Sequence, residues 1–106
     1  MMVSDRILQQ ATQRLVDKFH PHRIILFGSQ ARGTAGVRSD VDLLVVSSLS
    51  GKRRGLMVRM DRVLSTLACA FDVVILTPKE FQRDREIPGT IGRYAYREGR
   101  VLYERS

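Results

Sequence analysis

The segment Ile24-Ile25-Leu26-Phe27-Gly28-Ser29, followed ten residues after the serine by Asp40-Val41-Asp42-Leu43-Leu44-Val45-Val46, decides the fold of this chain. Each apolar run is as long as a strand, and the Gly-Ser pair predicts a tight turn into a short helix or loop. Asp40 and Asp42 are two residues apart, so both side chains project from one face of an extended strand. Two like charges on an otherwise apolar strand are costly unless a cation lies between them. The pattern therefore indicates divalent metal ions, with a nucleotide as the first ligand to consider.

Length and composition predict a single domain over residues 1–106. The chain has 106 residues, of which 43% are hydrophobic, which is enough for a modest core. No apolar run approaches the roughly 20 residues that cross a bilayer, and the N-terminus lacks the apolar region of a signal peptide. The single cysteine, Cys69, cannot form an internal disulfide. We therefore expect a cytoplasmic protein with no membrane segment.

The charge is strongly basic, with a formal net value of +7. If Asp40, Asp42 and Asp72 share one site, the rest of the chain sets eighteen basic residues against only eight acidic ones. Such a surface suits polyphosphate or an acidic protein partner, although a merely solvated basic surface explains it as well. Nucleic acid is a weaker candidate, because basic and aromatic residues do not interleave.

Apolar periodicity predicts alternating helices and strands. The predicted helices are residues 4–19, with Ser4 as N-cap, and residues 52–70, 78–83 and 90–98. The predicted strands are residues 23–27, 40–46, 71–76 and a terminal edge strand over residues 100–104. Because the central strand is apolar on both faces, the fold class is α/β (α+β), a small mixed sheet of three to four strands flanked by helices.

Two further features leave alternatives open. Asp72 lies near the start of the third strand, where a lone aspartate is usually a turn or cap residue, but a third carboxylate would complete a two-metal cage. The basic helix face from Lys52 to Arg62 could meet triphosphate, a partner protein or only solvent.

The motif resembles a known superfamily. Gly28-Ser29, ten residues and Asp40-Val41-Asp42 match the Gly-Ser-x10-Asp-x-Asp signature of the DNA polymerase β-like nucleotidyltransferases, and the strings 27–33 and 39–45 are similar to the minimal nucleotidyltransferases. The resemblance implies a polymerase β-like fold in which Asp40 and Asp42 bind two Mg²⁺ ions, while Asp72 binds one of them and helps to deprotonate the attacking hydroxyl.

The same resemblance assigns the nucleotide-binding residues. Gly28 and Ser29 would hold the phosphates of ATP. Arg32 would contact phosphate or pair with an acid that braces the turn. Ser39, just before the first aspartate, would cap the loop or touch the nucleotide.

Minimal nucleotidyltransferases are often paired with HEPN-domain proteins as toxin–antitoxin systems. The resemblance thus implies an antitoxin that transfers AMP from ATP to a hydroxyl, a tyrosine in characterised cases, of a HEPN-type toxin. The alternative is a non-enzymatic binding module that neutralises a partner by occlusion, in which three aspartates would have no purpose. Sequence leaves open whether the chain forms a homo- or hetero-oligomer.

Overall fold

The computed structural model describes residues 3–33 and 40–105. The elements follow in the order α1 (Asp5–Phe19), β1 (Arg23–Phe27), α2 (Ser29–Arg32), β2 (Val41–Val46), α3 (Arg53–Leu64), β3 (Phe71–Leu76), α4 (Pro78–Asp84), α5 (Ile91–Glu98) and β4 (Arg100–Glu104). Within these described residues, none of the helices has both the length and the apolar character that a membrane span requires.

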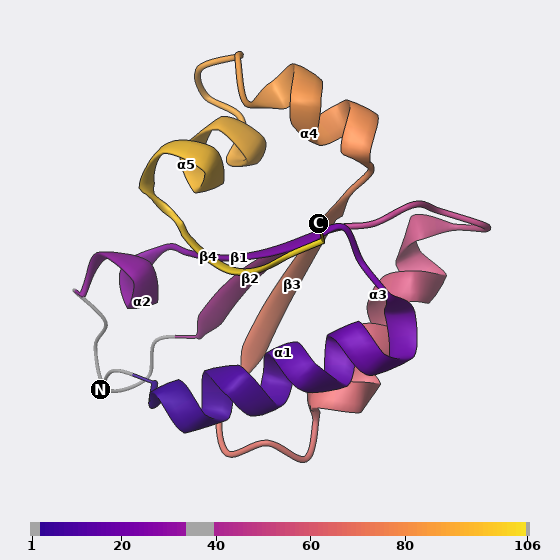
Figure 1. Ribbon diagram of the computed structural model, residues 1–106, viewed down its shortest axis with the longest axis vertical. Helices are drawn as coiled ribbons and strands as arrows, with labels where there is room; N and C mark the ends of the chain where they lie inside the picture. The colour runs from indigo at the N-terminus through magenta and orange to yellow at the C-terminus, as the bar shows by residue number, and fades with distance from the viewer. Residues whose placement is uncertain (1–2, 34–39, 106) are drawn as a thin grey trace.

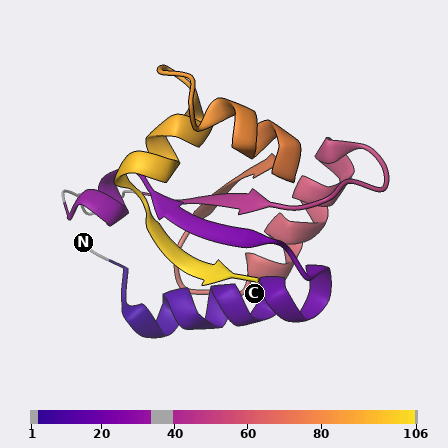
Figure 2. The ribbon, with the colours of Figure 1, turned by 45° about the horizontal axis from the view of Figure 1, so that its top comes forward.

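The strands form one mixed sheet in the order β3-β2-β1-β4. Strand β1 pairs antiparallel with both β2 and β4, whereas β2 and β3 run parallel (Figure 2). The helix α3 provides the crossover that two neighbouring parallel strands require. The predicted mixed α/β sheet flanked by helices is confirmed, with β4 at one edge and β3 at the other.

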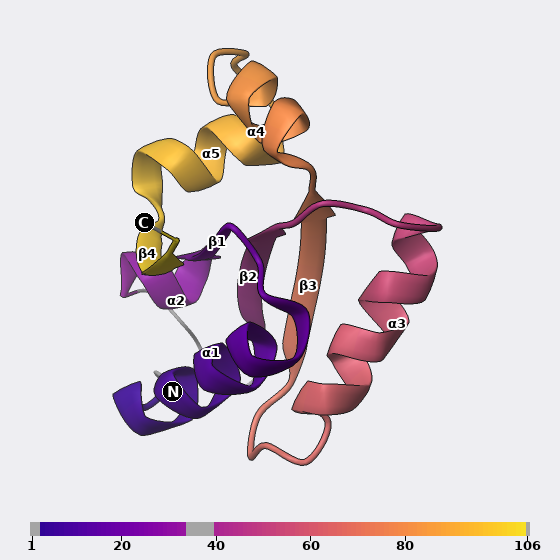
Figure 3. The same cartoon turned by 45° about the vertical axis from the view of Figure 1, so that its right-hand side comes forward.

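Helices cover both faces of the sheet, which explains why β2, apart from Asp42, is apolar on both faces. Helices α1 and α3 lie on one side, and α4 and α5 lie on the other (Figures 1 and 3). Leu43 and Val45 pack into the core with α1 and α3, while Leu44 and Val46 pack into a second core with Phe81 of α4. Side chains that alternate along one strand therefore fill two cores.

Most helix boundaries agree with their predicted caps. The Ser4 hydroxyl accepts from the Ile7 N–H at the start of α1, and Thr77 and Glu80 form a capping box at the start of α4. The predicted helix over residues 52–70 was too long, because α3 ends at Leu64. The Ser65 hydroxyl donates to the Arg62 carbonyl at 2.8 Å, a local bond that competes with helical hydrogen bonding.

Candidate functional site

Two of the predicted site aspartates lie side by side on the neighbouring strands β2 and β3. Asp42 and Asp72 are direct partners in the parallel register, so their side chains leave the same face of the sheet. On its other side Asp42 is paired with Phe27, the residue that precedes the Gly-Ser turn. Three neighbouring strands thus bring the turn and two carboxylates, which are far apart in sequence, to one end of the sheet.

Gly28 lies in direct contact with Asp42. Its backbone has φ 75° and ψ −156°, a conformation that side chains other than hydrogen rarely allow. A Cβ atom at this position would lie 2.3 Å from Oδ2 of Asp42. The glycine is therefore required twice, for the turn itself and for the close approach of the turn to the carboxylate.

The carboxylates at this end of the sheet destabilise one another. Burial raises the pKa of the Asp42 carboxyl, and the charges of Asp72 and then Asp40 raise it further. Burial also raises the pKa of Asp61 on α3, with Asp72 as a second cause. A bound cation would relieve this repulsion. Sequence reasoning missed Asp61, because it belongs to no motif and lies within the basic helix face.

The donor set fits Mg²⁺ in kind, since Mg²⁺ binds carboxylate oxygens. Asp40 precedes β2 and is exposed, so the shared strand face predicted for Asp40 and Asp42 does not apply to Asp40. Among residues 3–33 and 40–105, no three His, Cys, Asp or Glu side chains are arranged to hold a metal ion. The three-aspartate metal site thus stays a prediction, supported by the pairing of Asp42 with Asp72 and by their mutual repulsion.

Arg32 contacts an aromatic ring. Its Cζ atom lies 5.8 Å from the ring centroid of Tyr94 on α5, and that ring packs edge-on against Phe27 with centroids 6.1 Å apart. Pairing with an acid was one alternative for Arg32, but no carboxylate in the described part of the chain forms an ion pair with it. Sequence gave no signal for Tyr94, whose place beside the turn depends on how α5 packs.

Of the other two predicted nucleotide-binding residues, the structure describes Ser29 but not Ser39. Ser29 is the first residue of α2, directly after Gly28. Gln30, which the motif did not single out, is buried and accepts a hydrogen bond from the Val3 N–H at 2.8 Å. This bond ties the start of the chain to the turn. Ser39 lies outside the described residues.

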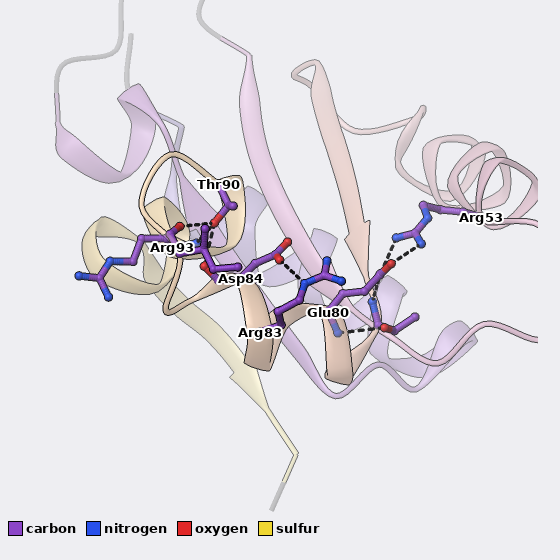
Figure 4. Close-up of polar contacts among 8 residues, drawn as sticks. Arg53, Glu80, Arg83, Asp84, Thr90 and Arg93 are labelled. Carbon is purple, nitrogen blue, oxygen red and sulfur yellow. Dashed lines mark hydrogen bonds and ion pairs between the residues drawn. The ribbon is translucent and has the colours of Figure 1, made fainter.

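The basic helix face contains one residue with a structural role. Arg53 donates two hydrogen bonds to the Glu80 carboxylate, at 2.7 and 2.8 Å, and one to the Ile75 carbonyl at 2.7 Å (Figure 4). This guanidinium is therefore committed to Glu80 and to β3. Lys52, Arg54, Arg59 and Arg62 are exposed.

Comparison with known proteins shows which family this chain belongs to. The family model described as a nucleotidyltransferase domain matches residues 8–101, so the chain belongs to the nucleotidyltransferase domain family. One relative is MJ1305 of Methanocaldococcus jannaschii, named as a candidate protein adenylyltransferase, which is 50% identical over 52 residues. The match spans 49% of this chain and only 34% of that relative.

Two solved structures share the fold. A candidate nucleotidyltransferase from Sulfolobus solfataricus superposes with a TM-score of 0.63 at 18% identity, covering 94% of this chain and 79% of that one. A chain from a toxin–antitoxin structure with AMP-PNP gives a TM-score of 0.64 at 19% identity, covering 98% of this chain and 76% of that one. These likenesses confirm the nucleotidyltransferase fold.

Proposed function

We propose that this protein is a Mg²⁺-dependent nucleotidyltransferase that moves AMP from ATP to a hydroxyl group of a partner protein. The observation that carries the proposal is the pairing of Asp42 with Asp72 beside the Gly28 turn, in a chain that belongs to the nucleotidyltransferase domain family. Carboxylates held next to a glycine turn suit a substrate that brings both phosphates and cations.

The two aspartates are suited to different roles. Asp42 is half-buried in the second strand of the sheet, whereas Asp72 is exposed on the edge strand β3. An acceptor hydroxyl can therefore approach from the side of Asp72, whose carboxylate takes its proton. The acceptor oxygen then forms a bond to the α-phosphorus, the bond from that phosphorus to the bridging oxygen breaks, and pyrophosphate leaves with the electron pair.

Asp40, Asp42 and Asp72 would hold two Mg²⁺ ions. When bound, Mg²⁺ neutralises charge on the transferring and leaving phosphates. Gly28 and Ser29 hold the nucleotide phosphates at the start of α2, where the turn lies against the Asp42 carboxylate. Arg32, one helical turn further on, adds a cation for the same phosphates.

The acceptor we propose is a tyrosine of a HEPN-domain toxin, so that the chain acts as an antitoxin. Three observations support this acceptor: the resemblance to minimal nucleotidyltransferases, a relative named for protein adenylylation, and a neighbouring fold from a toxin–antitoxin structure. The basic surface of the chain, with a net charge of +7, favours an acidic partner surface.

The proposal is tested by label transfer. The protein is incubated with Mg²⁺, ATP labelled at the α-phosphate and a HEPN-domain protein from the same genome, and label on the partner is measured. We expect transfer by the wild type and none by Asp42→Asn. Asp84→Asn is the matched control, because Asp84 is half-buried on α4 and bonded to Arg83, away from the Asp42–Asp72 pair.

Unchanged transfer by Asp42→Asn would refute the assigned site. If an Asp40→Asn/Asp42→Asn double variant still neutralised the partner in full, the chain would act by occlusion instead.

A further inference from the structure

Tyr94 is braced between the sheet and the Gly-Ser turn. One side of its ring meets Phe27 in an edge-to-face contact with an interplanar angle of 81°. The Arg32 guanidinium lies over the same ring, 5.8 Å from its centroid. Since Phe27 is paired with Asp42 and precedes Gly28, the ring lies beside the predicted nucleotide site. The contact joins α5 to α2, two elements that are remote in sequence.

The Arg32 guanidinium contacts the Tyr94 ring rather than a carboxylate. No carboxylate in the described residues pairs with Arg32, although those residues form five such ion pairs elsewhere. Cation–π contact orients a guanidinium without neutralising its charge, so its N–H donors stay available to an anion. A nearby carboxylate would instead have competed with phosphate.

The Tyr94 hydroxyl contributes nothing to this arrangement. It is buried and has no hydrogen-bond partner among the described residues. The aromatic ring is thus the part of Tyr94 that contacts Arg32 and Phe27. A phenylalanine at this position would preserve both contacts.

We propose that Tyr94 is a positioning residue that holds Arg32 beside the Gly28–Ser29 turn, where the guanidinium meets the nucleotide phosphates. This inference rests on the proposed function, since it concerns nucleotide bound at that turn. Tyr94 acts through Arg32, and its ring sets the direction of the guanidinium before the nucleotide arrives. Prior orientation of this kind lowers the entropic cost of binding.

The test combines ATP binding by calorimetry with steady-state transfer. Loss of a surface cation–π contact weakens binding by about two- to fivefold, so Tyr94→Leu should raise Kd and KM for ATP by that factor with little change in kcat. Arg32→Ala should cost about tenfold, because charge-assisted contacts to phosphate are stronger. The Arg32→Ala/Tyr94→Leu double variant should bind no more weakly than Arg32→Ala alone.

Two variants serve as controls. Tyr94→Phe keeps the ring and should bind ATP as the wild type does. Tyr96→Leu removes the matched contact on the same helix, where Arg85 lies 5.2 Å from the Tyr96 ring centroid, and should leave ATP binding unchanged.

Several results would overturn the inference alone: wild-type affinity in Tyr94→Leu, equal losses in Tyr94→Phe and Tyr94→Leu, or additive losses in the double variant. A wild-type protein that binds no ATP would instead refute the proposed function, and the role of Tyr94 with it.

Discussion

At the scale of single residues, the site depends on the contact between Gly28 and Asp42. The turn and the carboxylate approach so closely that no Cβ fits between them. The charged form of Asp42 is also destabilised, because burial and the charges of Asp72 and Asp40 raise its pKa. Such strain at a functional site is a common cost of activity, since the ligand offsets it when it binds.

Gly28→Ala should abolish nucleotidyl transfer and lower stability. The substitution adds a Cβ 2.3 Å from Asp42 Oδ2, at a φ of 75° and a ψ of −156°, a backbone region that is essentially restricted to glycine and costs an L-residue about 1–3 kcal/mol. Gly33→Ala is the control, because Gly33 also has a φ of 75°, with a ψ of 19° in the left-handed region, and no atom of the described residues lies within 4 Å of its Cβ. It should lower the melting temperature but keep transfer activity. Equal activity losses in the two variants would show that an alanine at a positive φ next to α2 is sufficient to abolish transfer, without any contact with Asp42.

At the scale of elements, Glu80 joins three parts of the fold. Its carboxylate caps α4 by accepting from the Thr77 N–H at 2.8 Å, and the same group accepts two bonds from Arg53 of α3. Arg53 also donates a hydrogen bond to the Ile75 carbonyl near the end of β3. Hydrogen bonds from Arg53, followed by the Thr77 backbone, lower the pKa of Glu80 to about 2.

Glu80→Gln should lower the free energy of unfolding at pH 7 by about 1–2 kcal/mol, because a charged bidentate bond and part of a cap are lost. The Glu80 pKa is lower in the folded state than its ordinary 4.5, so its stabilisation is present above pH 4.5 and disappears as the pH falls towards 2. Urea unfolding at several pH values measures both effects. Glu98→Gln, which alters an exposed glutamate on α5, should change stability by less than about 0.5 kcal/mol. A difference between Glu80→Gln and wild type that is independent of pH would contradict the assignment.

Two helical glycines should respond to alanine in opposite directions. A Cβ at Gly92 of α5 would lie 2.8 Å from Cβ of Asp84 and 3.3 Å from Cδ1 of Leu76, so Gly92→Ala should destabilise by about 1–3 kcal/mol. Gly55 of α3 has open space, so Gly55→Ala should stabilise by about 0.5–1 kcal/mol through helix propensity. Thermal unfolding measures both. Stabilisation by Gly92→Ala would show that α5 packs less closely on α4 than described.

At the scale of the whole molecule, the two cores share the strands between them. Leu43 and Leu44 are adjacent in β2, yet Leu43 packs with α1 and α3 while Leu44 packs on the side of α4 and α5. The site occupies one end of the same sheet. Its geometry therefore depends on both helical layers.

We expect both cores to unfold in one transition. Each core contains side chains of β1 and β2, so unfolding of these strands disrupts both cores at once. Leu15→Ala and Leu44→Ala each truncate a fully buried side chain, one on each face, and should each cost about 2–5 kcal/mol. Methyl NMR during urea titration follows Met60 in one core and Ala95 in the other. The two signals should share one midpoint in the wild type and in both variants. Separate midpoints would show that the layers unfold independently.

Sequence predicted the strands and most helices, since their apolar period and the caps at Ser4 and Thr77 are local signals. For Asp72, sequence left a turn or cap residue and a third site carboxylate as alternatives, and the resemblance favoured the second; the parallel pairing of β2 with β3, which puts Asp72 next to Asp42, was not predicted. The contacts of Arg32 with Tyr94 and of Arg53 with Glu80 could not be predicted. They depend on how α4 and α5 pack against the sheet, and no local pattern records that geometry.

We propose that the Asp42–Asp72 pair supports transfer of the α-phosphoryl group of ATP together with its nucleoside. The most direct measurement compares ATP labelled at the α-phosphate with ATP labelled at the γ-phosphate, using wild-type protein and Asp72→Asn in the presence of Mg²⁺ and a HEPN-domain protein from the same genome as the proposed acceptor. We expect only the α-label to reach the partner, and we expect Asp72→Asn to transfer neither label. Transfer of the γ-label, or undiminished α-label transfer by Asp72→Asn, would contradict this proposal.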